Sequence, residues 1–165
     1  GFVDPSGGSA DAFTLSIAHM EKGRVIIDLV HAIKPPFSPE QATAQLCDIL
    51  HNYRVVCVYG DAYAGEWPRE QFRKNRIDYI RIKKPKSELY KNLLPLLNSE
   101  HIELPPSEQL ARELLNLERR TSRGGRDTID HPVGFHDDLI NAVAGVAEVT
   151  KTTGAPTPIK INFCY

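Results

Sequence analysis

Residues 128–145 read TIDHPVGFHDDLINAVAG, and this stretch carries the strongest pattern in the chain. Two adjacent aspartates, Asp137 and Asp138, stand at the start of an apolar segment that predicts a helix from about residue 135 to 149. At 100° per residue, Asp138 falls at the edge of the apolar face, beside Gly145, whereas Asp137 falls on the polar side. We therefore expect Asp138 to point towards the edge of a sheet, and Asp137 to face solvent, a partner beside the site, or DNA. A small residue at position 145 would let this helix approach the sheet closely.

The rest of the chain predicts an α/β domain. β-branched runs separated by Gly and Pro turns predict an antiparallel three-stranded meander over residues 1–34, and the later alternation of helices and strands is typical of a parallel sheet. The strands are expected at residues 1–6, 12–21, 24–34, 54–61, 77–83 and 101–104, and the further helices at 38–52, 66–76, 87–98 and 107–120. The polar segment 121–134, with its Gly-Gly pair, predicts an exposed hairpin or loop. We expect residues 1–150 to form one domain and residues 151–165 a tail that is flexible or adds an edge strand.

The composition is that of a globular protein without a strong overall field. Of 165 residues, 41% are hydrophobic and 25% charged, and the net charge is −1. A polyanion must therefore be bound by local basic clusters. Cys47, Cys57 and Cys164 form no C-x-x-C pair, so we expect reduced thiols and no cysteine zinc site. No apolar run is long enough to cross a bilayer, and no signal peptide is visible, so no membrane partner is expected.

Three carboxylates are placed where a metal site would need them. Asp4 lies in the first predicted strand, Asp61 ends the strand that follows the first helix, and Asp138 opens the last helix. If the first strand neighbours the Asp61 strand, their backbones are about 4.8 Å apart. Carboxylates at that spacing repel one another unless a hard cation such as Mg²⁺ lies between them. Two such ions about 3.5–4 Å apart promote phosphodiester cleavage without a protein nucleophile.

Each of these acids also has an ordinary structural explanation. An acidic residue in the first turn of a helix complements the helix dipole, which would account for Asp137 or Asp138 alone. Asp4 precedes a proline and Asp61 follows a glycine, and both arrangements are common in turns. The metal-site interpretation depends on the three positions together.

Basic and polar residues surround the same segments. The basic clusters, which we expect either to clamp DNA phosphates or to form a solvated surface, contain Arg119, Arg120, Arg123, Arg126, Lys83, Lys84 and Lys86. His131 and His136 are a poor zinc pair, because no cysteine or third histidine is near in the sequence. We expect His136 and Asn141 to lie beside the carboxylates, and His136 to orient a water or a phosphate.

Three segments together resemble the nuclease domain of the large terminase subunit of tailed bacteriophages. They are VDPSGG (3–8), VYGDAYAGEW (58–67) and GRDTIDHPVGFHDDLINAVAG (125–145). The third is the specific one, because a basic, Gly-containing hairpin leading into this HDDL motif is rare elsewhere. The resemblance extends over nearly all of residues 1–150. It implies an RNase H-like fold, with a mixed sheet of three antiparallel strands followed by parallel strands, flanked by helices.

The resemblance also implies an activity. Domains of this family cut concatemeric double-stranded viral DNA with Mg²⁺ or Mn²⁺, and motif matching makes Asp4, Asp61 and Asp138 the metal-binding acids, with Asp137 as an adjacent candidate. Full-length relatives carry an N-terminal packaging ATPase and work with the portal and the small terminase subunit in the host cytoplasm. No G-x-x-x-x-G-K-[ST] phosphate loop occurs here, so we expect the isolated nuclease half. A Holliday-junction resolvase-like or integrase-like nuclease, and a non-catalytic DNA- or portal-docking module, stay open as alternatives.

Overall fold

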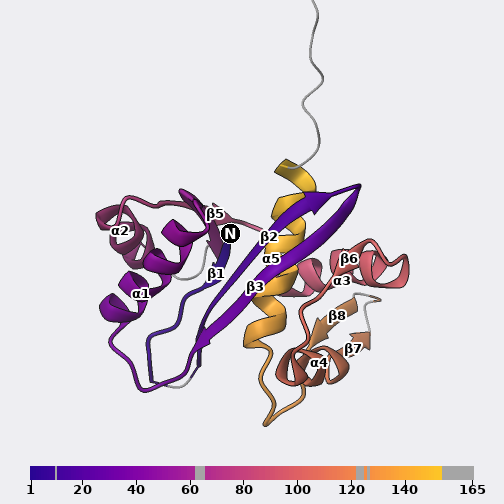
Figure 1. Ribbon diagram of the computed structural model, residues 1–165. Helices are drawn as coiled ribbons and strands as arrows, with labels where there is room; N and C mark the ends of the chain where they lie inside the picture. Colours follow the sequence, from indigo (N-terminus) through magenta and orange to yellow (C-terminus); the bar gives the residue numbers. More distant parts are fainter. Residues whose placement is uncertain (10, 62–65, 122–124, 126, 154–165) are drawn as a thin grey trace, which may run out of the picture.

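The computed structural model describes residues 1–9, 11–61, 66–121, 125 and 127–153. The predicted tail strand, and the predicted DNA contacts Arg123 and Arg126, lie outside the described residues. Figure 1 shows a mixed sheet with helices packed around it.

The sheet has six strands in the order β5-β4-β1-β2-β3-β6. They are β1 (Phe2–Asp4), β2 (Phe13–Glu21), β3 (Arg24–Ile33), β4 (Cys57–Asp61), β5 (Asp78–Ile82) and β6 (Ile102–Glu103). β1, β2 and β3 form the predicted antiparallel meander. β4 pairs with β1 in parallel, β5 with β4, and the short β6 with β3. The predicted α/β class, with three antiparallel strands followed by parallel strands, is thus confirmed.

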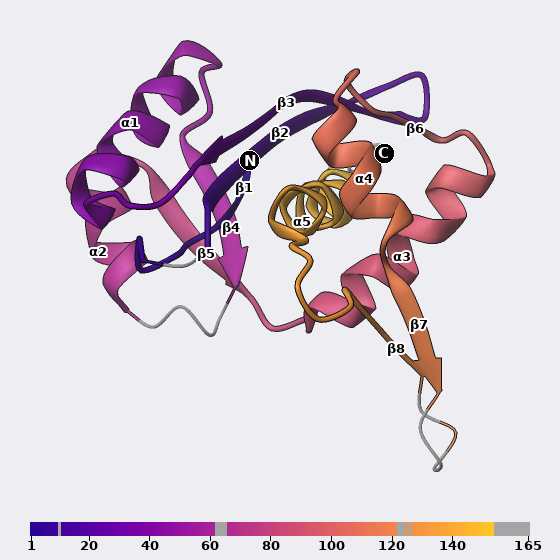
Figure 2. The same ribbon diagram turned by 90° about the horizontal axis from the view of Figure 1, so that it is seen from below.

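In the described part of the chain, five helices cover the two faces of this sheet. They are α1 (Pro39–Asn52), α2 (Trp67–Lys74), α3 (Lys86–Asn98), α4 (Glu108–Leu115) and α5 (Asp138–Thr153). Adjacent residues of β1 point to opposite faces, as a strand requires: Val3 packs in the core formed with α1 and α2, and Phe2 in the core formed with α3, α4 and α5. Figure 2 shows α1 and α2 on one side of the sheet and α5 on the other. The central position of α5 brings its first residues to the end of β1.

Gly145 lets α5 approach the sheet as expected. A Cβ atom built on this residue would lie 2.5 Å from ring atoms of Phe2, which is closer than van der Waals contact allows. Phe2 is only 1% exposed and is enclosed by the core, so its ring has no free space to move into.

We expect Gly145→Val to lower the free energy of unfolding by about 1–3 kcal/mol, the usual effect of overpacking a filled core. Urea denaturation followed by circular dichroism would measure it. Gly23→Ala is not a suitable control, because the positive φ of 79° at Gly23 would strain a residue with a Cβ atom. The control is Ala44→Val, at a partly exposed position of α1. Equal stability of Gly145→Val and the parent would show that the helix is not held at this distance.

Two helices, α4 and α5, have boundaries that depart clearly from the sequence expectation. The helix expected over residues 107–120 ends at Leu115, and residues 118–121 form a strand, β7 (Glu118–Thr121), paired with β8 (Asp127–Asp130). All four β7 residues are exposed, so they lack the alternating apolar pattern that marks a strand. The last helix begins at Asp138 rather than near residue 135 and continues to Thr153. Figure 2 shows β7 and β8 as an arm projecting from the helical side of the domain.

Two expectations from composition can be compared with the structure. Cys47 and Cys57 are free thiols, while Cys164 lies outside the described residues. In the part of the chain that is described, no helix combines the length and apolar character needed to cross a bilayer.

Candidate metal centre

The register of two strands places Asp4 beside Asp61. Phe2 pairs with Tyr59 and Val3 with Gly60 in the parallel β1–β4 ladder, so Asp4 and Asp61 occupy the next position on adjacent strands. Backbones of adjacent strands lie about 4.8 Å apart. The two strands are therefore neighbours, which is the condition that the metal-site interpretation required.

The start of α5 brings Asp138 to the same end of the sheet. The Ala12 amide donates to Asp138 Oδ2 at 3.4 Å, and the Thr14 hydroxyl donates to the Asp138 carbonyl oxygen at 3.0 Å. Both contacts tie the helix terminus to the chain entering β2. A cleft of about 630 Å³ opens here, and its acidic lining residues are Asp4, Asp11, Asp61, Asp137 and Asp138.

The electrostatics of Asp4 show how crowded the carboxylates are. Burial raises the pKa of Asp4 to about 6, against the effect of a hydrogen bond from Asn141. The carboxylates that add to this rise belong to Asp138, Asp61 and Asp137. Burial also raises the pKa of Asp138. Several negative charges thus meet in one partly enclosed space, where a cation would relieve their repulsion.

Asn141 connects α5 to this cluster. Its Nδ2 donates to Asp4 Oδ2 at 2.6 Å, and the side chain lines the cleft. The residue is only 5% exposed, yet its Oδ1 has no hydrogen-bond partner within the described chain. A buried carbonyl oxygen without a partner is costly, so the cleft offers an oxygen ready for a cation or a water. The expected position of Asn141 beside the carboxylates is observed.

Asp137 is buried, so the expectation that it faces solvent is not met. It is 6% exposed, and its Oδ2 accepts from the Tyr90 hydroxyl at 2.8 Å and lies 3.0 Å from Lys86 Nζ. Its Oδ1 lies 3.6 Å from His131 Nε2. α5 begins at Asp138, so Asp137 directly precedes the helix, and its carbonyl oxygen accepts from the Asn141 amide at 2.8 Å. The side-chain contacts fit another of the three expectations, that of a partner beside the site.

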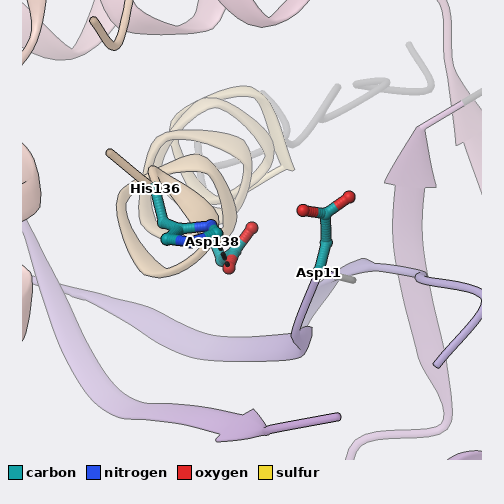
Figure 3. A group of neighbouring side chains, drawn as sticks. All are labelled: Asp11, His136 and Asp138. Atoms are coloured by element: carbon teal, nitrogen blue, oxygen red, sulfur yellow. Dashed lines mark ion pairs between the residues drawn. The ribbon is translucent and has the colours of Figure 1, made fainter. Parts of the chain in front are cut away.

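A group around Asp138 is capable of holding an ion. Asp11, His136 and Asp138 each offer a ligand atom, and these atoms lie within 4.8 Å of one another. Figure 3 shows the His136 ring beside Asp138 at the start of α5, with Asp11 reaching towards them from the segment before β2. His136 Nδ1 is 3.9 Å from Asp138 Oδ2. Asp11 was missed from the sequence, because it lies in a polar turn that no motif marks.

A second group of possible ligands, Asp130, His131 and Asp137, already has a cation of the protein beside it. Lys86 Nζ lies 2.8 Å from Asp130 Oδ1 and 3.0 Å from Asp137 Oδ2. Although burial opposes it, hydrogen bonds to these two carboxylates raise the pKa of Lys86. The ammonium group therefore neutralises this group, and the two histidines of the motif belong to different groups rather than to one zinc pair.

The other predicted DNA contacts lie on the surface, several of them paired. Arg119 pairs with Asp127, and Arg120 Nη2 lies 2.9 Å from Glu118 Oε2, within the projecting β7–β8 arm. Lys84 pairs with Glu148 of α5, whereas Lys83 is exposed. Exposed pairs contribute little to stability, so these cations can exchange their partners for phosphates. Their role in DNA binding stays a prediction.

Comparisons with known proteins identify structural neighbours. No protein-family model and no curated protein sequence matches the chain. The crystal structure of the large terminase nuclease from thermophilic phage G20c matches with a TM-score of 0.75 and 20% identity, over 88% of this chain and 78% of that one. A structure of the G20c nuclease with bound magnesium matches with a TM-score of 0.66 and 19% identity, over 84% and 82%.

A third neighbour comes from another virus. It is the K428A mutant nuclease domain of the large terminase subunit gp2 of bacterial virus Sf6, with manganese and beta-thujaplicinol. It matches with a TM-score of 0.67 and 14% identity, over 87% of this chain and 84% of that one. The chain therefore has the mixed-sheet α/β fold of the large terminase nuclease domains of phages G20c and Sf6.

Proposed function

We propose that the chain is the metal-dependent DNA endonuclease domain of a viral DNA-packaging terminase. The observation that carries this proposal is the meeting of Asp4, Asp61 and Asp138, from β1, β4 and α5, in one cleft. The fold it shares with nuclease domains solved with magnesium and manganese supports it.

The residues of the cleft fit a hard divalent cation. The donors are carboxylate oxygens, which Mg²⁺ and Mn²⁺ prefer. The buried Oδ1 of Asn141, which has no hydrogen-bond partner within the described residues, adds a neutral oxygen that an ion or a water would satisfy. Within the described residues, the Asp138 carboxylate accepts from the Ala12 amide at 3.4 Å, a long contact that leaves it available to an ion. We assign Asp4, Asp61 and Asp138 as ligands, and Asp11 and His136 as residues that would complete a second position.

When bound, two ions at such a centre activate a water and stabilise the leaving oxygen of a phosphodiester. The protein's own residues hold the carboxylates for this task. Asn141 fixes one oxygen of Asp4, so the other stays available. Lys86 and Tyr90 hold Asp137, which anchors the turn leading into Asp138. We therefore assign Asp137 a positioning role next to the centre.

The substrate and partners follow from the same proposal. Concatemeric double-stranded DNA would be contacted by Arg119, Arg120 and Lys83, with Arg123 and Arg126 as further candidates. Lys84 and Lys86 serve first to neutralise acids of the protein. In a full-length protein, an N-terminal packaging ATPase, the portal and the small terminase subunit would be the partners, in the cytoplasm of the infected host.

We expect the domain to nick and linearise supercoiled plasmid in Mn²⁺, and calorimetry to detect Mn²⁺ binding without DNA. Asp61→Asn should abolish both, whereas Asp48→Asn, an exposed acid on α1, should change neither. A four-way junction cut in strong preference to linear duplex would favour a resolvase instead. Absence of Mn²⁺ binding by the parent would leave only the docking-module alternative.

A further inference from the structure

A tight turn beside the metal centre presents apolar side chains to solvent. In residues 132–135, which we call the ridge, the Phe135 amide donates to the Pro132 carbonyl oxygen at 3.2 Å, and Gly134 has a φ of 86°. Val133 at its tip is 96% exposed, and Phe135 is 47% exposed. A positive φ at the third residue of such a turn favours glycine, so the sequence supports this shape.

The ridge stands between two depressions of the surface. On one side is the metal-centre cleft, which Phe135 and His136 help to line. On the other side is a depression of about 420 Å³, which we call the second hollow, and the same two residues line it too. Its remaining polar lining includes Lys34, Gln109 and Arg112. A chain molecule leaving the cleft across the ridge would enter the second hollow directly.

The free charge of the second hollow is positive. Lys34 is exposed and forms no ion pair in the described part of the chain. The Arg112 side chain is 72% exposed, and Nη2 reaches only the exposed Glu108 at 3.6 Å. The acidic residue here, Glu113, is 6% exposed, and its Oε2 accepts from the first amides of α5, at 2.8 and 3.1 Å. The Glu113 carboxylate therefore already interacts with groups inside the protein.

The metal-centre cleft cannot hold a polyanion with its own cations. Its lining is rich in carboxylates, and its lysine, Lys86, is already paired with Asp130 and Asp137. A strand cut there needs positive charge just outside the cleft, because phosphate neutralisation supplies most of the affinity for nucleic acid. Lys34 and Arg112 supply such charge in the second hollow, on the other side of the ridge.

We propose that the second hollow binds a phosphate of the DNA strand that passes through the metal-centre cleft, and that Val133 and Phe135 pack against the nucleotides between the two depressions. This inference rests on the proposed function and adds a binding surface to it. Apolar side chains packed on bases and cations on phosphates are the usual division of work at such surfaces.

The charges are tested with the double variant Lys34→Glu/Arg112→Glu. Fluorescence anisotropy with a labelled DNA duplex in EDTA measures affinity over a range of salt concentrations. We expect weaker binding and a slope of log K against log salt that is smaller by roughly one for each lost phosphate contact. Lys22→Glu is the control, since its side chain is 88% exposed at the far end of β3, about 30 Å along the strand from Lys34.

The ridge is tested with Val133→Ser/Phe135→Ser. We expect affinity for the duplex to fall by about tenfold, the effect of losing the burial of one large apolar side chain, with no change in the salt slope because no charge is removed. Since both side chains are largely outside the core, the melting temperature should equal that of the parent.

The Mn²⁺ affinity of every variant, measured by calorimetry, separates this inference from the proposed function. The inference predicts that it equals the parent's. If the parent binds Mn²⁺ and cuts plasmid, but the variants keep its DNA affinity and salt slope, the second hollow is not a DNA surface and the proposed function stands. A parent that binds no Mn²⁺ removes both.

Discussion

Asp138→Asn is expected to abolish Mn²⁺-dependent cleavage, by at least about 100-fold, and to leave the fold intact. The substitution removes one anionic ligand oxygen but keeps the size of the side chain. Few contacts of the fold depend on this carboxylate: the Ala12 amide at 3.4 Å and His136 Nδ1 at 3.9 Å. Plasmid cleavage and Mn²⁺ calorimetry measure the loss, and thermal denaturation in EDTA should show no decrease in stability.

Asp137→Asn, the same change one residue earlier, is the matched comparison. Here the lost charge leaves Lys86 with one carboxylate fewer and weakens the contact of Tyr90, so we expect a loss of about 1–3 kcal/mol in the free energy of unfolding. Mn²⁺ binding should be retained, because Asp137 is occupied by partners within the protein. The opposite pattern, with Mn²⁺ binding lost in Asp137→Asn and kept in Asp138→Asn, would make Asp137 the ligand.

Local sequence patterns predicted those features of the fold that depend on local periodicity. The antiparallel pairing of β1, β2 and β3 followed from the turns between them, and the close approach of α5 followed from Gly145. The end of α4 did not, because residues 118–121 are as polar as an exposed helix and become a strand only by pairing with β8. Long-range pairing of exposed residues leaves no periodic signal in either partner.

The candidate site likewise contains residues that local patterns predict and residues that only the fold brings together. Asp4, Asp61 and Asp138 were found because each stands at the end or start of an element, where sites gather. Asp11 stands in a turn, and only the contact between the β2 entry and α5 brings it to Asp138. The pairing of Lys86 with Asp130 and Asp137 joins residues far apart in the sequence. A basic cluster alone could not distinguish this internal counter-ion from a DNA contact.

The metal-free domain is expected to lose stability as the pH rises, and Asp4→Asn should remove most of that loss. The raised pKa of Asp4, about 6 against an ordinary value near 3.8, means that the native state binds this proton more tightly than the unfolded chain does. The resulting stabilisation is fully present below about pH 4 and is lost as the pH rises through about 6. A shift of about two pKa units corresponds to roughly 2–3 kcal/mol.

Urea denaturation of the parent and of Asp4→Asn in EDTA, from pH 4 to 8, measures this difference. As the pH rises, the free energy of unfolding of Asp4→Asn should increase relative to that of the parent by roughly 2–3 kcal/mol. Asp48→Asn should have the same pH dependence as the parent. Saturating Mn²⁺ should reverse the order at pH 7.5, because the ion stabilises only a protein that binds it, and the variant lacks a ligand. If the variant and the parent differ in free energy of unfolding by the same amount at pH 4 and pH 8, the charge of Asp4 does not destabilise the fold. If the order at pH 7.5 reverses only when Mn²⁺ is present, the same carboxylate both destabilises the empty cleft and binds the ion.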